Sequence, residues 1–513
     1  MNPMSPMTLM APMAPMSSDL LLITAVWALP LLGALLARLM PASRTHAPRR
    51  IAVATALTTL AAAVAVFARD AAEHAFARTD VPAAPILLGL RYHVGVDGLS
   101  ALLLPVTAAV GACALAAAPR RELDRRAVAQ LLFALGSILG VLVSLDALLL
   151  ALFWTLSLVP LRAELARRGE RVASAAFNVV FFGSAAPMLL FVVALALLGR
   201  QDPALSSAPF DLIALSQSGA LAAGWRGTLL GGLVLLAALA RIGCFPLHVW
   251  IPALAERGPG PLGLASFATP IGIFVVARVL LPVFPGLCEQ VMPVLLPLGL
   301  VTAIYGAVVA LGQNDLRRML GYFWISQQGF LLSGLSALNP EGVSGALLHA
   351  IGTVVVRTGL LVVAAAVLAR TGTTDVRLLG GLVQRAPVMS TAFLLLSAAA
   401  IGLPGSMGFV SEDLIAQGLL RSHGLAAGAL LVATALNGIL LIRAFQRVFL
   451  AGPSPHADPS RGFTDLMPRE RWVVFSLLAL LLVGGIAVSP LLAVRGGVVD
   501  ALHSAAPAAP SHG

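Results

Sequence analysis

The sequence contains no lysine: all 33 residues in the lysine plus arginine total are arginine. Charge is scarce altogether, because only 11% of the 513 residues are charged and 59% are hydrophobic. A soluble chain of this length has no interior large enough to hide so much apolar surface. The composition therefore excludes a soluble globular protein. The net charge of +10 requires no nucleic-acid partner, since basic residues collect in the cytoplasmic loops of membrane proteins.

Cysteine is also scarce. The three cysteines, Cys113, Cys244 and Cys288, are scattered through apolar segments. Their spacing fits neither a metal site nor a disulfide framework, so we interpret them as small core residues. The sequence also lacks a glycine-rich fingerprint and a cysteine cluster, the patterns typical of nucleotide and iron–sulfur sites. We therefore expect no metal and no cofactor in this chain.

Apolar runs, in contrast, recur along the whole sequence. Each is long enough to cross the ~30 Å hydrocarbon core of a bilayer as a helix. We predict an all-α polytopic membrane protein with about fourteen transmembrane helices, which cover residues 20–40, 51–68, 99–118, 127–144, 146–163, 174–198, 227–245, 260–283, 291–312, 320–338, 343–369, 389–418, 424–449 and 472–494.

Arginine is concentrated in alternate connections between these segments. The odd-numbered connections hold Arg38, Arg44, Arg49, Arg50, Arg120, Arg121, Arg125, Arg126, Arg162, Arg167, Arg168, Arg171, Arg317, Arg318, Arg370, Arg377, Arg385, Arg461, Arg469 and Arg471. By the positive-inside rule these connections are cytoplasmic, which predicts that both termini lie outside an inner (plasma) membrane. Residues 1–19 are rich in Met and Pro without any basic residue. We interpret them as a disordered leader rather than a signal peptide.

Two crossings contain helix breakers at corresponding places. One has Pro246 and Pro252 beyond an apolar half-helix, and the other has Gly402, Pro404 and Gly405 in mid-span. Proline removes an intrahelical hydrogen bond, and the freed carbonyl in lipid must be satisfied by protein or water. Paired broken helices indicate inverted repeats with a functional cavity at the breaks, although ordinary proline kinks would give the same pattern.

The breaks and the charge pattern divide the chain into predicted regions. We expect two inverted five-helix repeats between N-terminal helices and a C-terminal helix. The regions are a leader (1–19), N-terminal transmembrane helices (20–118), a first repeat (127–283), a second repeat (291–449), a cytoplasmic loop (450–471), and a C-terminal helix with its tail (472–513).

Five ordered stretches carry a family likeness. They are YHVGVDGLS (92–100), FPLHVWIPALAE (245–256), AIYGAVVALGQNDLRRMLGY (303–322), LARTGTTDVRLLGGL (368–382) and IGLPGSMGFVSEDL (401–414). In order and spacing they resemble the antiporter-like membrane subunits of respiratory complex I, specifically the M type of NADH-quinone oxidoreductase, in the Mrp-like antiporter superfamily. The resemblance covers nearly the whole chain. It implies a fourteen-helix fold and a subunit that itself carries no redox group.

The resemblance further implies a midplane row of ionisable side chains that moves protons. In such a row a buried lysine has a lowered pKa, and a nearby carboxylate raises it again. This sequence departs from that pattern at every lysine and histidine position of the row and at its first glutamate. Thr155 stands at the expected glutamate, Arg241 at the expected lysine of the first broken helix, Pro270 or its neighbour Thr269 at the next lysine, and Gln327 and Thr353 at two expected histidines.

These departures remove switching groups. A threonine hydroxyl does not titrate, so Thr155 cannot bias a neighbour by changing its charge. Arginine stays protonated up to a pKa of about 12 or above, so Arg241 can neutralise an anion but cannot release and recover a proton. The sequence therefore predicts that the channel is weakened or silent in this region.

One acid of the row survives. Glu412 matches the acid of the second broken helix, and Asp413 follows it. Two adjacent carboxylates at membrane depth are costly unless they are hydrated or paired. We weigh two interpretations equally: a half-site for a proton or cation, and a carboxylate that pairs with Arg357 or Arg443.

Four further buried groups are candidates for an ion path. Asp146 opens the fifth crossing, where capping of the helix is the favoured role. Arg357 lies in the apolar run TVVVRTGLLVV, and a structural ion pair is favoured over transport. His349 is interpreted as a satisfied core histidine rather than a relay. His248 matches a histidine of the family and is interpreted as part of a proton-entry or gating loop.

The leading hypothesis for function is a membrane-arm subunit of a complex I-like NADH-quinone oxidoreductase. It would participate in proton translocation coupled to electron transport, with its own channel degenerate. One alternative is a subunit of a cation/proton antiporter or of an inorganic-carbon uptake complex. Another is a purely architectural subunit in which Arg241 locks the cavity as a fixed cation. In each case the expected partners are other membrane subunits and the lipid bilayer, with no nucleic acid.

Overall fold

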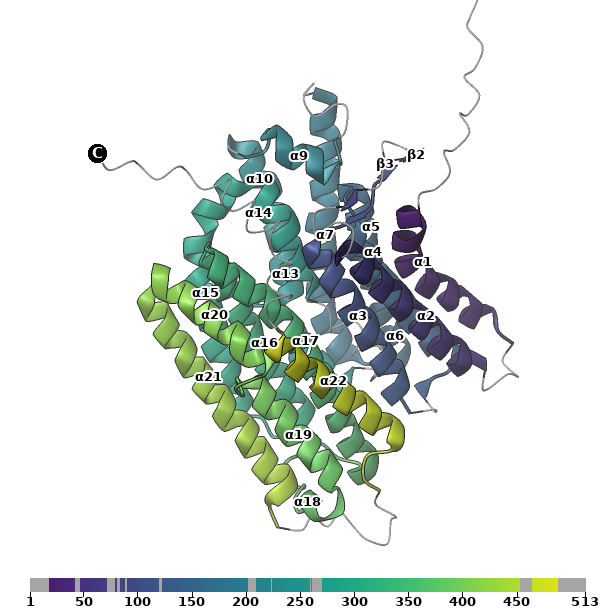
Figure 1. The fold of residues 1–513 in the computed structure, drawn as a ribbon, viewed down its shortest axis with the longest axis vertical. Helices are drawn as coiled ribbons and strands as arrows, with labels where there is room; N and C mark the ends of the chain where they lie inside the picture. The colour runs from purple at the N-terminus through teal and green to yellow at the C-terminus, as the bar shows by residue number, and fades with distance from the viewer. Residues whose placement is uncertain are drawn as a thin grey trace, which may run out of the picture.

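The computed structural model describes residues 18–41, 47–71, 79–80, 84–87, 90–119, 122–201, 209–222, 224–258, 260, 270–452 and 464–487. Most of these residues lie in helices that run side by side (Figure 1). Figure 1 shows α1 and α2 at one edge of the molecule and α21 at the opposite edge, with α16 and α17 between them. Most of the predicted leader, half of the 450–471 loop and most of the C-terminal tail fall outside the described residues.

The helices before residue 260 are α1 (Ser18–Leu39), α2 (Ala47–Arg69), α3 (Gly98–Ala117), α4 (Arg125–Val143), α5 (Ala147–Leu156), α6 (Val159–Arg168), α7 (Arg171–Gln201), α9 (Leu212–Ser218), α10 (Gly224–Ile242) and α11 (Trp250–Arg257). Those after it are α13 (Ile271–Val275), a π-helical turn η3 (Val276–Leu280), α14 (Leu281–Val283), α15 (Pro285–Leu311), α16 (Leu316–Ser336), α17 (Pro340–Thr371), α18 (Leu382–Arg385), α19 (Pro387–Ala400), α20 (Met407–Ser422), α21 (Gly424–Phe445), a second π turn η4 (Gln446–Leu450) and α22 (Pro468–Ile486).

Ten described helices are long and apolar enough to span a membrane: Ser18–Leu39, Ala47–Arg69, Gly98–Ala117, Arg125–Val143, Ala147–Arg168, Arg171–Arg200, Gly224–Ile242, Pro285–Leu311, Pro340–Thr371 and Gly424–Leu450. Two shorter apolar helices cover Ile271–Val283 and Pro387–Ala400. The prediction of a polytopic helical membrane protein is confirmed. The count of fourteen crossings and the inverted repeats stay predictions.

Short polar side chains set the starts of several helices. The carboxylate of Asp97 accepts the backbone N–H of Ser100 at the start of α3, and Asp124 accepts that of Ala127 in α4. The side chain of Asn339 accepts the backbone N–H of Gly342 at the start of α17. Each cap satisfies an N–H group that has no partner inside the helix, which matters most next to a medium without water.

Two small antiparallel sheets interrupt the helical pattern between α2 and α3. One pairs β1 (Thr79–Asp80) with β4 (Gly95–Val96), and the other pairs β2 (Ala84–Leu87) with β3 (Leu90–Tyr92). The all-α prediction missed them. Apolar runs here are too short for a spanning helix and are punctuated by proline and glycine, the pattern of short strands.

Glycine allows a close approach of two helices, α15 and α16. A Cβ atom on Gly306 would lie 2.3 Å from the backbone nitrogen of Ser326, and one on Gly329 would lie 2.3 Å from that of Ala303. Small residues at such crossings let backbones meet in a membrane protein, where the hydrophobic effect does not drive helix association. This contact fixes α16, whose middle carries several of the candidate site residues.

Both crossings predicted to be broken are broken in the structure: α10 is separated from α11, and α19 is separated from α20. A smaller irregularity lies at Ser157 and Leu158, between α5 and α6, with Pro160 in the first turn of α6. Both residues keep αR backbone angles, so Ala147–Arg168 remains one apolar crossing.

Candidate functional site

Arg241 occupies the last turn of α10, at the edge of the first predicted break. The residue is 9% exposed, and its Nη2 donates a hydrogen bond to Ser157 Oγ over 3.0 Å. The guanidinium carbon lies 5.6 Å from the ring centroid of Trp154, within the range of a cation–π contact. The predicted buried cation is therefore present and held by a hydroxyl and an aromatic face.

Thr155 does not provide that hydroxyl. Its Oγ1 atom is buried without a hydrogen-bond partner among the described residues, and Ser157 contacts Arg241 instead. Ser157 directly follows the last residue of α5, Leu156, and its side chain is the one that reaches the arginine. The sequence drew attention to both hydroxyls but could not choose between them.

Arg357 lies in the middle of α17 and is 7% exposed. Its guanidinium carbon is 5.1 Å from the ring centroid of Trp324, so each buried arginine of this region stacks on a tryptophan. Arg241 and Arg357 also line one small cavity of about 30 Å³, together with Pro270 and other residues. The predicted pairing of Arg357 with Glu412 is wrong, as described below.

His349 forms two buried hydrogen bonds. Its Nε2 lies 2.8 Å from Gln327 Oε1, and its Nδ1 lies 3.0 Å from Ser411 Oγ. A neutral imidazole with its proton on Nε2 donates to Gln327 and accepts from the serine hydroxyl. A protonated imidazole donates to both, because the Ser411 hydroxyl can turn to the Gly408 carbonyl oxygen 2.9 Å away. Both charge states of His349 therefore keep their hydrogen bonds.

Gln327 and Thr353, at the two histidine positions of the family, lie beside His349. All three residues line a cavity of about 10 Å³. Thr353 donates its hydroxyl to the Ala350 carbonyl oxygen over 3.0 Å, which leaves it a local helix contact. The histidine that the row retains is thus His349, one turn before the expected position.

Glu412 lies in α20, just after the second predicted break. Its Oε2 accepts a hydrogen bond from Thr434 Oγ1 over 3.0 Å, and among the described residues it forms no ion pair. The alternative in which Glu412 pairs with Arg357 or Arg443 is therefore wrong. A hydroxyl satisfies the carboxylate without fixing its charge, which leaves it free to titrate.

Asp413, the adjacent acid, behaves differently. Its side chain is exposed, and its Oδ2 accepts a hydrogen bond from Gln417 one turn later over 2.7 Å. Glu412 is turned toward the protein and Asp413 away from it. The structure does not bring the two carboxylates together into one site.

A further link crosses from α21 to α16. Asn437, which is 1% exposed, donates to Ser326 Oγ over 2.9 Å, and Ser326 precedes Gln327 in α16. The buried polar groups of the second half thus connect α21, α16, α17 and α20. We name this set the second-half polar row; its members are Asn437, Ser326, Gln327, His349, Ser411, Glu412 and Thr434.

His248 lies between α10 and α11 and is 5% exposed. Its Nε2 is 3.1 Å from the Tyr305 hydroxyl, and its ring stacks on Phe245. Its Nδ1 is buried without a partner among the described residues. Protonation would bury a second N–H donor with no acceptor, so the geometry favours a neutral, structural histidine.

Asp146 caps α5, which confirms the capping interpretation. Its Oδ1 accepts the backbone N–H groups of Leu148 and Leu149. It pairs by a single β-bridge with Asp211, and Asp211 Oδ2 lies 3.2 Å from His93 Nδ1. Burial raises the pKa of Asp146 to about 6. Burial also acts on Asp211, but hydrogen bonds from His93 and backbone N–H groups outweigh it and hold its pKa below the usual value.

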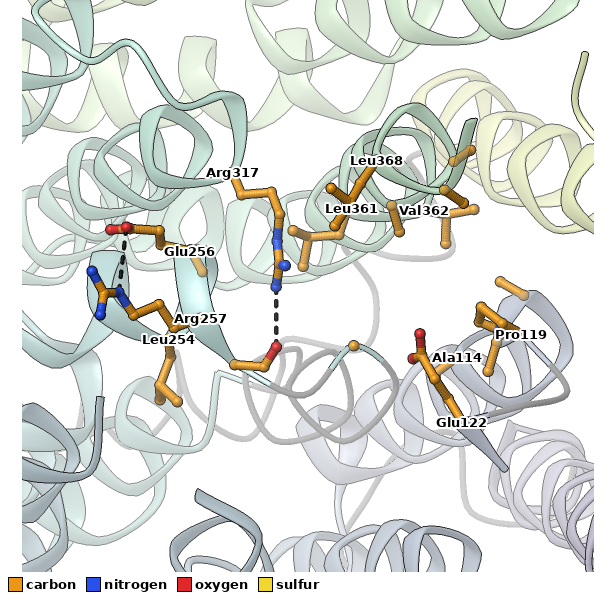
Figure 2. Close-up of a pocket in the computed structure, with 18 of the residues that line it drawn as sticks. Ala114, Pro119, Glu122, Leu254, Glu256, Arg257, Arg317, Leu361, Val362 and Leu368 are labelled. Carbon is orange, nitrogen blue, oxygen red and sulfur yellow. Dashed lines mark hydrogen bonds and ion pairs between the residues drawn. The ribbon is translucent and has the colours of Figure 1, made fainter. Parts of the chain in front are cut away.

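A larger cavity of about 520 Å³ opens near the ends of α3, α11 and α16. Figure 2 shows Arg317 pointing into it from one wall, with Glu122 across from it and Leu361 on a neighbouring wall. Arg317 donates to the Gly258 carbonyl oxygen over 3.1 Å. Its lining combines charged side chains with alanine, leucine and valine, and more of the lined surface is apolar than polar.

Several contacts were not foreseen from the sequence. Arg278, in the η3 turn, forms an ion pair of 2.7 Å with Asp97, the cap of α3. Trp154, Trp324 and the residues around them gave no local signal, because tryptophan in an apolar helix is ordinary. Among the described residues no group of three or more His, Cys, Asp or Glu side chains could hold a metal ion.

The comparisons with known proteins agree on one family. The model of the family described as "NADH:quinone oxidoreductase/Mrp antiporter, TM" matches residues 144–437, more than half of the chain. NADH-quinone oxidoreductase subunit M of Mycobacterium tuberculosis is 27% identical over 527 residues, which is 93% of this chain and 93% of that protein.

Two solved structures share the fold. A chain of respiratory complex I from Thermus thermophilus superposes with a TM-score of 0.82 at 24% identity, over 94% of this chain and 99% of that one. A chain of the Mrp complex from Dietzia sp. gives a TM-score of 0.81 at 19% identity, over 94% and 97%. The predicted family is confirmed: this chain belongs to the NADH:quinone oxidoreductase/Mrp antiporter family of membrane proteins.

Proposed function

We propose that this chain is an M-type membrane-arm subunit of a complex I-like NADH-quinone oxidoreductase and that its second half takes part in proton translocation. Family membership and the close relation to a subunit M over 93% of both chains support the assembly. In this arrangement its partners are other membrane subunits, and the chain itself supplies a path rather than redox chemistry. Arginine in alternate connections supports an orientation in the plasma membrane with both termini outside.

The observation that carries the proton step is the setting of His349. This imidazole can gain or lose a proton while both of its hydrogen bonds persist, because one hydroxyl, that of Ser411, reorients. Ser411 is followed by Glu412, whose carboxylate accepts a hydrogen bond from Thr434 and from no other side chain among the described residues. The second-half polar row therefore offers two groups that can change charge, next to a broken helix whose freed backbone groups need protein or water as partners.

Around Arg241 the described residues of the first half include no such pair. Arg241 keeps its charge, Ser157 is neutral, and the Thr155 hydroxyl has no hydrogen-bond partner among the residues that the structure describes. We therefore assign proton movement to the second half and a fixed, supporting role to the first.

The test compares Glu412→Gln with Asp413→Asn in membranes that hold the whole complex. The two acids are adjacent, yet only Glu412 is turned into the polar row, so Asp413→Asn is a matched control. NADH-driven proton uptake into inverted vesicles is measured together with NADH oxidation. We expect Glu412→Gln to lower the number of protons per NADH and Asp413→Asn to leave it unchanged. Equal values for both variants and wild type would remove Glu412 from the mechanism.

A second candidate is a subunit of a cation/proton antiporter complex. The observation in its favour is the TM-score of 0.81 to a chain of an Mrp complex, nearly equal to that for complex I. The two assemblies differ in their energy source. Proton uptake that depends on an imposed sodium gradient and persists without NADH would favour the antiporter.

A further inference from the structure

The carboxylate of Glu412 is held from a second helix. Its Oε2 accepts a hydrogen bond from the Thr434 hydroxyl over 3.0 Å, and Thr434 belongs to α21 whereas Glu412 belongs to α20. The same oxygen lies beside the broken segment of the crossing, because a Cβ atom on Gly402 would be 3.8 Å from it. One hydroxyl therefore holds the carboxylate between α21 and the break.

The Glu412 side chain has room to point elsewhere. It is long and flexible, so ordering it costs conformational entropy. The residue is only partly buried, and the next one, Asp413, is exposed and accepts a hydrogen bond from Gln417 on the outer side of α20. Among the described residues no other side chain donates to Glu412. The bond from Thr434 is therefore the contact that selects one orientation of the carboxylate.

The position of Thr434 is in turn fixed by the packing of α21. Thr434 and Asn437 are three residues apart, so they lie on one face of the helix. Asn437 is 1% exposed and donates to Ser326 Oγ in α16 over 2.9 Å. Hydrogen bonds of this kind hold helices together in a bilayer, where the hydrophobic effect does not. The hydroxyl that binds Glu412 thus comes from a helix that is itself anchored to α16.

These contacts close a ring of four helices. His349 of α17 contacts α20 through Ser411 at 3.0 Å and α16 through Gln327 at 2.8 Å. Helix α21 completes the ring, because Thr434 reaches α20 and its neighbour on the same face reaches α16. His349 and Glu412, the two groups of the ring that can change charge, are therefore held by one set of contacts. The bond from Thr434 is the one that keeps the Glu412 carboxylate in it.

We propose that Thr434 is a positioning residue for proton translocation, whose hydroxyl holds the Glu412 carboxylate at the break and in the ring that contains His349. The inference rests on the proposed function and adds to it a residue that the sequence did not single out. A hydroxyl suits this part because it can donate to the carboxylate and equally to the carbonyl oxygen of the protonated acid. A basic side chain in its place would instead favour the charged form of Glu412.

The first experiment measures the contact itself, without turnover. Infrared spectra of the whole complex are recorded as the pH is lowered, and the C=O band of protonated Glu412 is identified by its loss in Glu412→Gln. A carbonyl that accepts a hydrogen bond absorbs at lower frequency than a free one. We expect the wild-type band at the hydrogen-bonded frequency, a shift to higher frequency in Thr434→Val, and recovery in Thr434→Ser. A free-carbonyl band in wild type would overturn the inference even if Thr434→Val does not assemble.

The second experiment measures the protons taken up per NADH in inverted vesicles. Loss of a hydrogen bond to a charged group should lower the population of the held orientation about tenfold or more. The ratio in Thr434→Val should therefore fall toward that of Glu412→Gln, and Thr434→Ser should restore it. Thr358→Val is the matched control, because this fully buried threonine donates only to the Val354 carbonyl of its own helix, over 2.8 Å. Its ratio should equal that of wild type.

The inference and the proposed function can fail separately. A wild-type ratio in Thr434→Val, beside a lowered ratio in Glu412→Gln, would refute the role of Thr434 and leave the proposed function standing. A wild-type ratio in Glu412→Gln would refute the proposed function, and the role of Thr434 with it. Equal falls in Thr434→Val and Thr358→Val would show a general effect of losing a hydroxyl and would also overturn the inference.

Discussion

In the first half of the molecule the buried polar side chains end on Arg241, which keeps its charge at every accessible pH. In the second half the proposed proton path includes His349 and Glu412, whose side chains are of types that can change charge. The two regions have the same kind of broken helix, α10 with α11 and α19 with α20. The scaffold therefore does not depend on the switching groups. One half can lose them and still pack its buried row around hydroxyls, amides and aromatic faces.

The buried histidines His248 and His349 sharpen the same contrast. His349 has a hydrogen-bond partner on each ring nitrogen, and His248 has one on Nε2 alone. A relay must hold a proton in both its loaded and unloaded states without leaving a buried donor unsatisfied. Of these two residues, only His349 meets that condition. The sequence favoured a proton role for His248 and a structural role for His349, and the geometry favours the opposite assignment.

The largest expected effect is on proton uptake in His349→Gln. Glutamine fills similar space and can still hydrogen-bond to Gln327 and Ser411, but it cannot carry a proton. We expect the protons taken up per NADH in inverted vesicles to fall to the level of Glu412→Gln. The fall should be the same in magnitude because the proposed path includes both residues.

The matched control for this variant is His248→Gln. Its ring contacts Tyr305 and stacks on Phe245, so the substitution removes packing but no relay. Proton uptake per NADH should stay near the wild-type value, with only a modest loss of thermal stability. A larger fall in uptake for His248→Gln than for His349→Gln would invert the assignment of the two halves.

The next prediction compares the ion pair between Glu470 and Arg370 with the ion pair between Asp97 and Arg278. Glu470 at the start of α22 pairs with Arg370 at 2.5 Å, with side chains 8% and 6% exposed. Glu470→Gln leaves the arginine charge buried, which should cost about 3 kcal/mol and lower Tm. Asp97→Asn also leaves Arg278 uncompensated, but Asp97 is 23% exposed and asparagine retains the cap. Its loss of Tm should be smaller, and a larger loss than in Glu470→Gln would contradict this ranking.

The sequence predicted the parts of this architecture that follow from composition and helix breakers. Apolar runs located the crossings, and Pro246 and Pro404 located two broken helices. The family stretches identified Arg241 and Glu412 before any contact was known. These features are local, since each depends on a short window of residues and on the thickness of a bilayer.

The contacts that define the site were not local. Ser157 rather than Thr155 contacts Arg241. Which of the two hydroxyls does so depends on how the end of α5 packs against α10, and Ser157 and Arg241 lie 84 positions apart in the sequence. Trp154 contacts Arg241 and Trp324 contacts Arg357 through packing between helices, which the hydrophobic periodicity of a sequence does not predict. The absence of an arginine partner for Glu412 likewise depends on where α20 faces, and the sequence left that alternative open.

A smaller effect is expected in the pH dependence of stability at Asp146, Asp211 and His93. The pKa of Asp211 lies below its usual value, so its pairing with His93 adds stability above about pH 4 and loses it as pH falls through the lowered folded pKa. Asp146 has a pKa raised to about 6, so its titration changes stability with pH in the opposite direction. To remove this contribution, the Asp211→Asn protein and its reference protein both carry Asp146→Asn. Asparagine at position 146 keeps the helix cap. In that background Asp211→Asn should lower Tm at pH 7 and make little difference near pH 3. An equal difference at both pH values would show that charge on Asp211 is unimportant.

The smallest expected effect is at Thr155, where the family has a glutamate. Its hydroxyl is buried without a partner among the described residues, so Thr155→Val should leave proton uptake unchanged and raise stability by up to about 1 kcal/mol. Ser157→Ala is the matched control, because it removes the acceptor of Arg241 Nη2 and should lower Tm. A fall in uptake in Thr155→Val would mean that protons pass this hydroxyl after all. The first half would then share the path, because a hydroxyl can pass a proton along a water chain without itself titrating.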